Sequence, residues 1–184
     1  MATIKVNKEG VAVGKSGNDT VLGDNRANVL IGGGGNDTLR GRGASDAVDG
    51  GTGDDKLYGD GGDDILSGGL GRDTLIGGSG ADFFGFDAKL SSANVDLIDD
   101  FNVKADTIAL YKKIFKISAN SNGDIKASAF WTGSSAHDAD DRLIYDKATG
   151  SLYYDPDGTG AKAAIQFAQL DANLNLTHKD FLIF

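Results

Sequence analysis

Apolar residues recur at every ninth position over a long central stretch of the chain. Residues 14–85 divide without insertion into eight units of nine residues, and the eighth position of each unit is apolar. One apolar residue between two flanking positions predicts a minimal strand with a single side chain pointing inward. The inward positions are Val21, Leu30, Leu39, Val48, Leu57, Leu66, Leu75 and Phe84.

The first six positions of each unit follow the pattern Gly-Gly-x-Gly-x-Asp, with Gly at the first position of all eight units. Glycine reaches positive φ without steric cost, so these segments predict tight turns. Two units would form one coil of eighteen residues. Stacked coils would place parallel strands about 4.8 Å apart and align the inward side chains. The pattern predicts an all-β fold: a parallel β-roll, that is, a solenoid of nonapeptide repeats.

The composition changes after residue 85. Seven of the nine Phe, four of the five Tyr and the single Trp lie in residues 86–184. Residues 95–98, 107–111, 143–145, 151–154 and 163–167 resemble strands, and residues 146–150 read as a hairpin loop. We expect a lead-in strand or cap over residues 1–13, the roll over 14–85, and a mostly β capping and secretion-signal region over 86–184.

Aspartate dominates the charge of the chain, with 26 Asp against one Glu and a net charge of −9. Asp favours turns and hard-cation ligation rather than helix faces. Nucleic acid and anionic membranes select Lys/Arg clusters, so neither is an expected partner. The chain has no Cys, which excludes disulfides and thiolate chemistry. No apolar run is long enough to predict a transmembrane segment.

The sixth position of each unit is acidic in seven of eight units. Stacked coils would bring these carboxylates within about 5 Å of one another, where like charges repel. Ca²⁺ accepts six to eight oxygens from carboxylates and carbonyls and would offset this repulsion, whereas Mg²⁺ requires a stricter octahedron. The sixth-position residues are Asp19, Asn28, Asp37, Asp46, Asp55, Asp64, Asp73 and Asp82.

These units resemble the RTX (repeats-in-toxin, hemolysin-type) nonapeptide, a calcium-binding β-roll repeat. The resemblance implies Ca²⁺ between a turn and the turn eighteen residues later, bound by sixth-position carboxylates and by carbonyls at the first, second and fourth positions. It pairs Asp19–Asp37–Asp55–Asp73 on one edge and Asn28–Asp46–Asp64–Asp82 on the other. Each pair of successive residues on one edge forms a possible ion site, here called a slot, which gives six slots and about five to seven ions. The implied carbonyl ligands are Gly32, Gly33, Gly35, Gly50, Gly51, Gly53, Gly59, Gly62, Gly68, Gly69, Gly71, Gly77 and Gly80.

Several positions depart from the repeat pattern, and four of them bear on the strength of the slots. Lys15 replaces a second-position Gly, Ala44 replaces a fourth-position Gly, and the second unit carries Arg26 and Asn28. We expect the Asn28–Asp46 slot to be the weakest, because it loses one formal charge and gains a nearby guanidinium.

Residues 95–101 and 105–108 resemble the segment that follows the repeats in serralysin-type secreted proteases. The resemblance places Asp100 and Asp106 on acidic positions that imply a further Ca²⁺, with strand-end turns as the alternative. The last residues, Asp180, Phe181, Leu182, Ile183 and Phe184, resemble the end of an uncleaved signal for a type I ABC exporter. A final core strand is the alternative, and both interpretations can hold together. Residues 1–10 lack the apolar core of a secretory signal, so we expect a bacterial, extracellular protein secreted by the type I route.

Two further acidic segments contain residues that could bind a metal ion. Residues 155–160 begin like an EF-hand loop, but the twelfth position is Gln166 where an EF-hand needs Glu. A turn between strands is the favoured interpretation. His137, Asp138, Asp140 and Asp141 could hold a metal, and a solvated loop is again favoured.

The sequence does not predict an enzyme. Neither histidine belongs to the zinc motif H-E-x-x-H, and no G-x-S-x-G elbow is present. A calcium-responsive folding and secretion module, free-standing or part of a larger secreted protein, is the preferred function. The alternative is a carbohydrate- or surface-binding accessory module of a polysaccharide-modifying enzyme or adhesin. That alternative favours exposed aromatics and a groove on one roll face, and the mixed residues at the outward seventh and ninth positions form no stripe.

Overall fold

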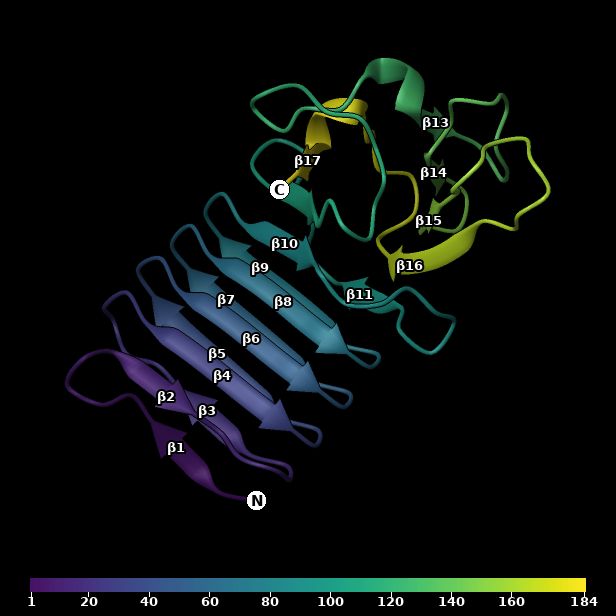
Figure 1. The fold of residues 1–184 in the computed structure, drawn as a ribbon. Helices are drawn as coiled ribbons and strands as arrows, with labels where there is room; N and C mark the ends of the chain where they lie inside the picture. Colours follow the sequence, from purple (N-terminus) through teal and green to yellow (C-terminus); the bar gives the residue numbers. More distant parts are fainter.

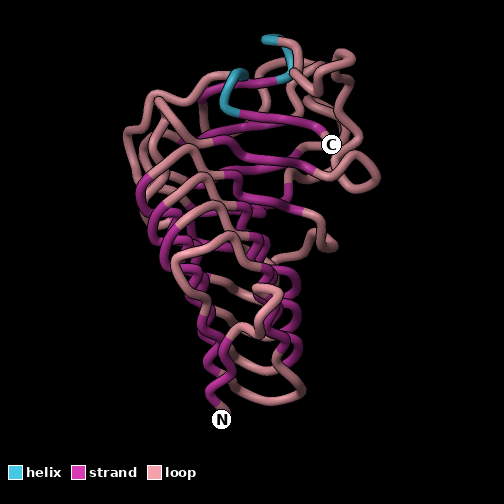
Figure 2. Tube along the Cα trace, turned by 90° about the vertical axis from the view of Figure 1, so that its left-hand side faces the viewer, coloured by secondary structure: helices cyan, strands magenta, loops and turns pink.

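Strands from alternate units of the repeat stack into two facing sheets, as Figures 1 and 2 show. The computed structural model describes residues 1–184. The ten-stranded sheet, here sheet A, has the order β1-β3-β5-β7-β9-β11-β16-β15-β14-β13. The seven-stranded sheet, here sheet B, has the order β17-β12-β10-β8-β6-β4-β2. The predicted parallel β-roll is therefore confirmed.

The strands of sheet A are β1 (Thr3–Lys5), β3 (Thr20–Leu22), β5 (Thr38–Gly43), β7 (Lys56–Gly61), β9 (Thr74–Ser79), β11 (Asp96–Ile98), β13 (Phe130–Thr132), β14 (Leu143–Asp146), β15 (Ser151–Tyr154) and β16 (Ile165–Gln169). The strands of sheet B are β2 (Val11–Val13), β4 (Val29–Gly34), β6 (Ala47–Thr52), β8 (Ile65–Leu70), β10 (Phe83–Phe86), β12 (Thr107–Leu110) and β17 (Phe181–Ile183). Two short 3₁₀ helices, η1 (Ala127–Ala129) and η2 (His178–Asp180), complete the elements. Neither helix has the length and hydropathy of a membrane-spanning segment.

Each repeat strand pairs in parallel with the strand eighteen residues later. Leu39 is opposite Leu57, and Leu57 is opposite Leu75. The inward side chains of the two sheets therefore meet in a ladder one residue wide on each side. All eight eighth-position residues are buried, from Val21 to Phe84.

Most repeat strands are longer than the three residues that the pattern predicts. Strands β4 to β9 each contain six residues and run through the first three positions of the following unit. The second position of that unit has positive φ, for example 104° at Gly33 and 101° at Gly51. Because the coil above repeats the same kink, Gly33 still pairs with Gly51 in the sheet.

Both sheets continue beyond the last repeat unit. Strand β11 pairs with β9 on sheet A, and β12 pairs with β10 on sheet B, so a fifth coil follows the repeats. Strands β16, β15 and β14 then extend sheet A with antiparallel pairs, and β17 extends sheet B. The aromatic rings of Phe115 and Phe167 pack edge to face in this part, with centroids 5.0 Å apart. All five predicted strand runs contain strands, and the predicted hairpin joins β14 to β15.

Candidate metal centre

The sixth-position residues form two rows, one along each edge of the roll. We call Asp19, Asp37, Asp55 and Asp73 the first Asp row, and Asn28, Asp46, Asp64 and Asp82 the second Asp row. Within each row, the backbone N–H of one residue donates to Oδ1 of the residue eighteen positions later. These N···Oδ1 distances lie between 2.6 and 2.8 Å. The structure thus brings together all six predicted pairs.

The six Asp residues that follow the first residue of each row, here called the inner Asp, use only one carboxylate oxygen in these bonds. Oδ2 is buried and has no hydrogen-bond partner in Asp37, Asp46, Asp55, Asp64, Asp73 and Asp82. A buried carboxylate oxygen without a partner costs free energy and calls for a ligand that the protein chain does not supply. Six such atoms in two regular rows indicate a repeated cation site.

The first-position glycines leave space beside these oxygens. An ideal Cβ added to Gly50 would lie 2.6 Å from Oδ2 of Asp55 and 2.6 Å from the carbonyl oxygen of Gly68 in the next coil. An ideal Cβ on Gly32 would lie 2.7 Å from Oδ2 of Asp37. Gly59, Gly68 and Gly77 are likewise placed beside Asp64, Asp73 and Asp82. The space is lined by oxygen atoms, so the residues present fit a hard cation such as Ca²⁺.

The pKa values of the row carboxyls differ between the N-terminal end of the roll and the positions further along. Burial, together with the neighbouring carboxylates, raises the pKa of Asp55 to about 7 and that of Asp82 to about 6. Burial also raises the pKa of Asp46 to about 6. By contrast, backbone N–H groups of Ala2 and Lys15 lower the pKa of Asp19 at the outer end. The inner carboxylates therefore carry the unfavourable charge that a cation would offset.

The rows differ at their N-terminal ends from the inner positions. The second oxygen of Asp19 accepts from the N–H of Lys15 at 3.1 Å, and Oδ1 of Asn28 accepts from the N–H of Asp24 at 2.7 Å. The guanidinium of Arg26 pairs with Asp24 at 2.7 Å. The expected penalty of this guanidinium on the Asn28–Asp46 slot is thus reduced, because Asp24 neutralises it locally.

The second- and fourth-position glycines have a conformational role. Positive φ occurs at Gly33, Gly35, Gly51, Gly53, Gly62, Gly69, Gly71 and Gly80, all of which are predicted carbonyl ligands. Three other residues adopt the same region in place of Gly, namely Arg42, Ala44 and Asp60, with φ of 88°, 67° and 73°. A left-handed conformation is costly for residues with a Cβ, so these three positions are locally strained.

Asp96 is a row residue that the sequence analysis missed. It is buried, and its Oδ1 accepts from the N–H of Asp73 at 3.2 Å, as the next Asp of the first row would. Burial and the charge of Asp73 raise its pKa. The spacing from Asp73 is 23 residues rather than 18, which hides the repeat. The available signal is the triplet Asp96-Leu97-Ile98, which matches the Asp-x-apolar triplet of the repeat.

Asp106 and Asp100 lie beside the last repeat units. Oδ1 of Asp106 accepts from the N–H of Asp82 at 3.1 Å, which continues the second Asp row, while its Oδ2 accepts from Asn102. Asp100 accepts from the N–H groups of Gly77 and Gly78 at 2.9 and 2.8 Å. Asp106 therefore occupies a row position, whereas Asp100 holds the backbone of the preceding coil.

The last five residues form part of the cap. Asp180 is buried and closes a capping box with Thr177 at the start of η2. Phe181 and Ile183 are buried in β17, which pairs with β12. Phe184 remains half exposed and packs on Tyr111, with ring centroids 5.5 Å apart. The tail is thus a core strand, which was one of the two compatible interpretations.

The remaining acidic segments form hydrogen-bonded loops. Ligand atoms of His137, Asp138 and Asp141 lie within 4.8 Å of one another. Oδ2 of Asp141 accepts from the N–H groups of His137 and Asp138, so this carboxylate holds the loop. In residues 155–160, Oδ1 of Asp155 accepts from the N–H of Asp157. Residues 155–160 form a turn between β15 and β16, and residues 137–141 form a loop in which Asp141 is buried.

The outer face of sheet B carries a row that the sequence analysis did not expect. Val11, Val29, Ala47, Ile65 and Phe83 occupy consecutive register positions on adjacent strands. Exposed fractions are 42% for Val29, 55% for Ile65 and 36% for Phe83. The expectation of no stripe is therefore wrong for this sheet. Consecutive units alternate between the two sheets, so the members of the row lie eighteen residues apart in the sequence.

Comparison with known proteins supports the repeat assignment. Residues 13–48, 41–75 and 49–84 match the family RTX calcium-binding nonapeptide repeat (4 copies). Among solved structures, the chain is similar to the R3 subunit of the mannuronan C5-epimerase AlgE6 of Azotobacter vinelandii. That match has 24% sequence identity and a TM-score of 0.47, and it covers 91% of this chain and 78% of the other. No curated protein matches the chain.

Proposed function

We propose that this chain is a calcium-dependent folding module whose roll binds several Ca²⁺ ions between successive coils. One observation carries the proposal: six buried Asp Oδ2 atoms in two rows have no partner within the chain. The residues that would hold the ions are the inner Asp of the two rows, with carbonyl oxygens of the glycine turns. Bound Ca²⁺ would supply positive charge and oxygen coordination, and the chain itself supplies the alignment of its coils.

The energetics favour coupling between calcium and folding. Without a cation, folding buries the inner Asp beside one another and raises the pKa of Asp55 to about 7. The glycine-rich turns also lose much conformational entropy on folding. A cation that binds only the folded roll shifts the equilibrium toward it by mass action. We infer cooperative folding, because each inner Asp borders two slots.

The module has no proposed catalytic role. We infer that residues 14–85 respond to calcium, while residues 86–184 cap the roll and carry the export signal for a type I ABC transporter. Low cytosolic calcium would keep the roll unfolded for export, and extracellular calcium would lock it. The last five residues, from Asp180 to Phe184, support this division because an acid precedes four apolar residues.

The test is calcium titration of the full chain followed by circular dichroism and calorimetry. We expect little β signal in chelator, a cooperative gain at Ca²⁺ concentrations of about 10⁻⁴–10⁻³ M, and several ions per chain. Mg²⁺ at the same concentration is the matched control and should produce a much smaller gain. An identical spectrum with chelator and with millimolar Ca²⁺ would contradict the proposal.

Binding of a glycan or cell-surface ligand is the second candidate function. The apolar row on sheet B favours it, since exposed apolar patches with polar rims are typical of interaction surfaces. Equivalent positions on sheet A carry mostly Thr, for example Thr20, Thr38 and Thr74. Pull-down by immobilised polysaccharide, compared between the wild type and Ile65→Ser, tests this role. Retention that is absent, or unchanged by the substitution, would count against it.

A further inference from the structure

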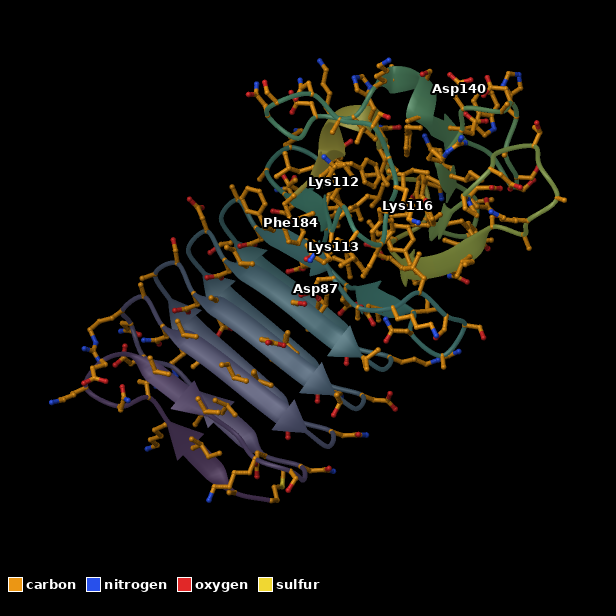
Figure 3. All side chains as sticks on the ribbon, in the orientation of Figure 1. Asp87, Lys112, Lys113, Lys116, Asp140 and Phe184 are labelled. Carbon is orange, nitrogen blue, oxygen red and sulfur yellow. The ribbon has the colours of Figure 1, made fainter.

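A small cavity in the C-terminal part gathers positive charge in an otherwise acidic chain. It has a volume of about 240 Å³, and we call it the cap pocket. Its polar lining residues are Lys116, Ser118, Lys126, Ser128, Asp140 and Arg142. Three cations thus face one carboxylate, although the chain as a whole has a net charge of −9. Figure 3 labels Lys116 and Asp140, which lie at the end of the molecule opposite the N terminus.

Hydrogen bonds of the cap hold the three cationic residues in place. The backbone N–H of Lys116 donates to Oη of Tyr154 at 3.1 Å. Lys126 precedes η1, and its carbonyl accepts from the N–H of Ala129 at 3.0 Å. The N–H of Arg142 donates to the carbonyl of Ala129, also at 3.0 Å. Lys126 and Arg142 are thus linked through the backbone of Ala129, while the Tyr154 hydroxyl holds Lys116.

The guanidinium of Arg142 is fixed without a carboxylate partner. Its Nη1 donates to the carbonyl oxygens of Ala139 and Asp141, each at 2.8 Å. Nε and Nη2 make no hydrogen bond within the chain, and none of the chain's ion pairs includes Arg142. By contrast, Arg40 donates from Nε and Nη2 to both oxygens of Asp60. Arg40 thus uses Nε and Nη2 to bind a carboxylate, whereas the same two donors of Arg142 are free.

The lysines of the pocket are also without acidic partners. Neither Lys116 nor Lys126 forms an ion pair, and the side chain of Asp140 accepts no hydrogen bond. The positive charge of the pocket is therefore not neutralised from within. An oxyanion that presents two oxygens side by side suits these donors, because a guanidinium binds carboxylate or phosphate-like groups through two parallel hydrogen bonds.

We propose that the cap pocket is a binding site for an oxyanion group, a carboxylate or a sulfate, carried by a small molecule or by one sugar residue. The volume is below the range of about 300–1,000 Å³ typical of drug-sized ligands, so one such group would fill it. Arg142 would orient the oxyanion, and the two lysines would add charge. The site is separate from the Asp rows and needs no metal ion.

The test is NMR titration of the calcium-loaded full chain with sodium sulfate and, separately, sodium glucuronate. We expect saturable shifts of the backbone amides of Lys116, Lys126 and Arg142, with Kd in the millimolar range, about 1 mM or above. Preference for glucuronate would assign a carboxylate ligand, and preference for sulfate would assign a sulfate ligand. Neutral glucose is the control for sugar binding and should leave these amides unchanged.

Substitutions distinguish specific anion binding in the cap pocket from nonspecific attraction of anions to positive charge. Arg142→Gln should weaken binding about tenfold, since charge-assisted hydrogen bonds are lost. The double variant Lys116→Gln/Lys126→Gln should also weaken binding and alters only exposed side chains, so folding is preserved. Lys113→Gln removes one positive charge, as Arg142→Gln does, at a lysine that lies over the Tyr111 ring and outside the pocket, and should leave Kd unchanged. Asp140→Asn should tighten binding.

Three results would overturn the proposal. The first is a linear, non-saturating response to both anions, and the second is an equal response to glucose. The third is the same Kd for Lys113→Gln and for Arg142→Gln, which each remove one positive charge. The calcium titration of the wild type does not depend on these three results. Failure of the oxyanion proposal would therefore not count against the calcium proposal.

Discussion

The backbone N–H of Asp37 donates to Oδ1 of Asp55 at 2.6 Å, while Oδ2 of the same carboxylate is buried without a partner. One side chain thus joins two coils and keeps one oxygen free. The amide bond fixes the rotation of the carboxylate, so the free oxygen is held in position before any cation arrives. The same arrangement recurs along both Asp rows.

Replacement of Asp55 by Asn should separate its two roles. Asn keeps the Oδ1 acceptor for Asp37 but replaces the free oxygen and removes the charge. We expect the calcium midpoint to rise about tenfold, because affinity follows the number of charged ligands. Asn28→Ala is the matched control at the end of the second row and should shift the midpoint much less. Equal shifts in the two titrations would show that the assignment of inner and outer slots is wrong.

Acid should stabilise the roll when no metal is bound. The pKa of Asp55 is raised to about 7 and those of Asp46 and Asp82 to about 6, whereas an unfolded Asp titrates near 3.9. The folded state therefore binds more protons than the unfolded state between these values. Stability without metal is highest below about pH 3.9 and falls as pH rises toward 7.

Circular dichroism of metal-depleted protein at about pH 5.5 and pH 8 measures this effect. We expect more residual β signal at pH 5.5, and a smaller pH dependence in Asp55→Asn. With calcium present the sign should reverse, because protons compete with the metal for the same carboxylates. A metal-free β signal that rises with pH would contradict the effect of carboxylate burial.

Ala44→Gly should stabilise the protein. Ala44 has φ of 67°, while fourth-position glycines such as Gly53 adopt positive φ freely. The relief of about 1–2 kcal/mol exceeds the entropy cost of about 0.5–1 kcal/mol that glycine adds in the unfolded chain. A net gain of roughly 0.5–1 kcal/mol in calcium-bound denaturant unfolding is expected. The control Ala47→Gly, in β6 without positive φ, should instead destabilise.

Phe181 and Phe184 should differ in their effects on folding and export. Phe181 is buried, so Phe181→Ala should cost about 3–5 kcal/mol of unfolding free energy. Phe184 is 53% exposed, and Phe184→Ala should cost about 1 kcal/mol or less. If the tail acts as an export signal, Phe184→Ala should reduce secretion through a cognate type I transporter while stability is nearly unchanged. Normal secretion of this variant would leave the last residue with a structural role alone.

The nine-residue period alone determined the fold of residues 14–85. Gly and Asp at fixed positions dictate the turn, and one apolar residue per unit dictates the inward side chain, so Leu39 and Leu57 could be placed opposite each other before the structure. The pairing of Asp37 with Asp55 followed from the same period. These features are local and repeated, and each coil contacts only its neighbours.

Only the tertiary structure decided which residues outside the nine-residue pattern join the roll and which distant residues lie together. Asp96 joins the first Asp row because a five-residue insertion loops out and lets Leu97 pair with Thr74. The row from Val11 to Phe83 emerges because alternate units belong to different sheets. The cap pocket gathers Lys116, Lys126 and Arg142, whose segments are held by non-local hydrogen bonds. Non-local pairing depends on how the irregular loops close, and no spacing in the sequence records that closure.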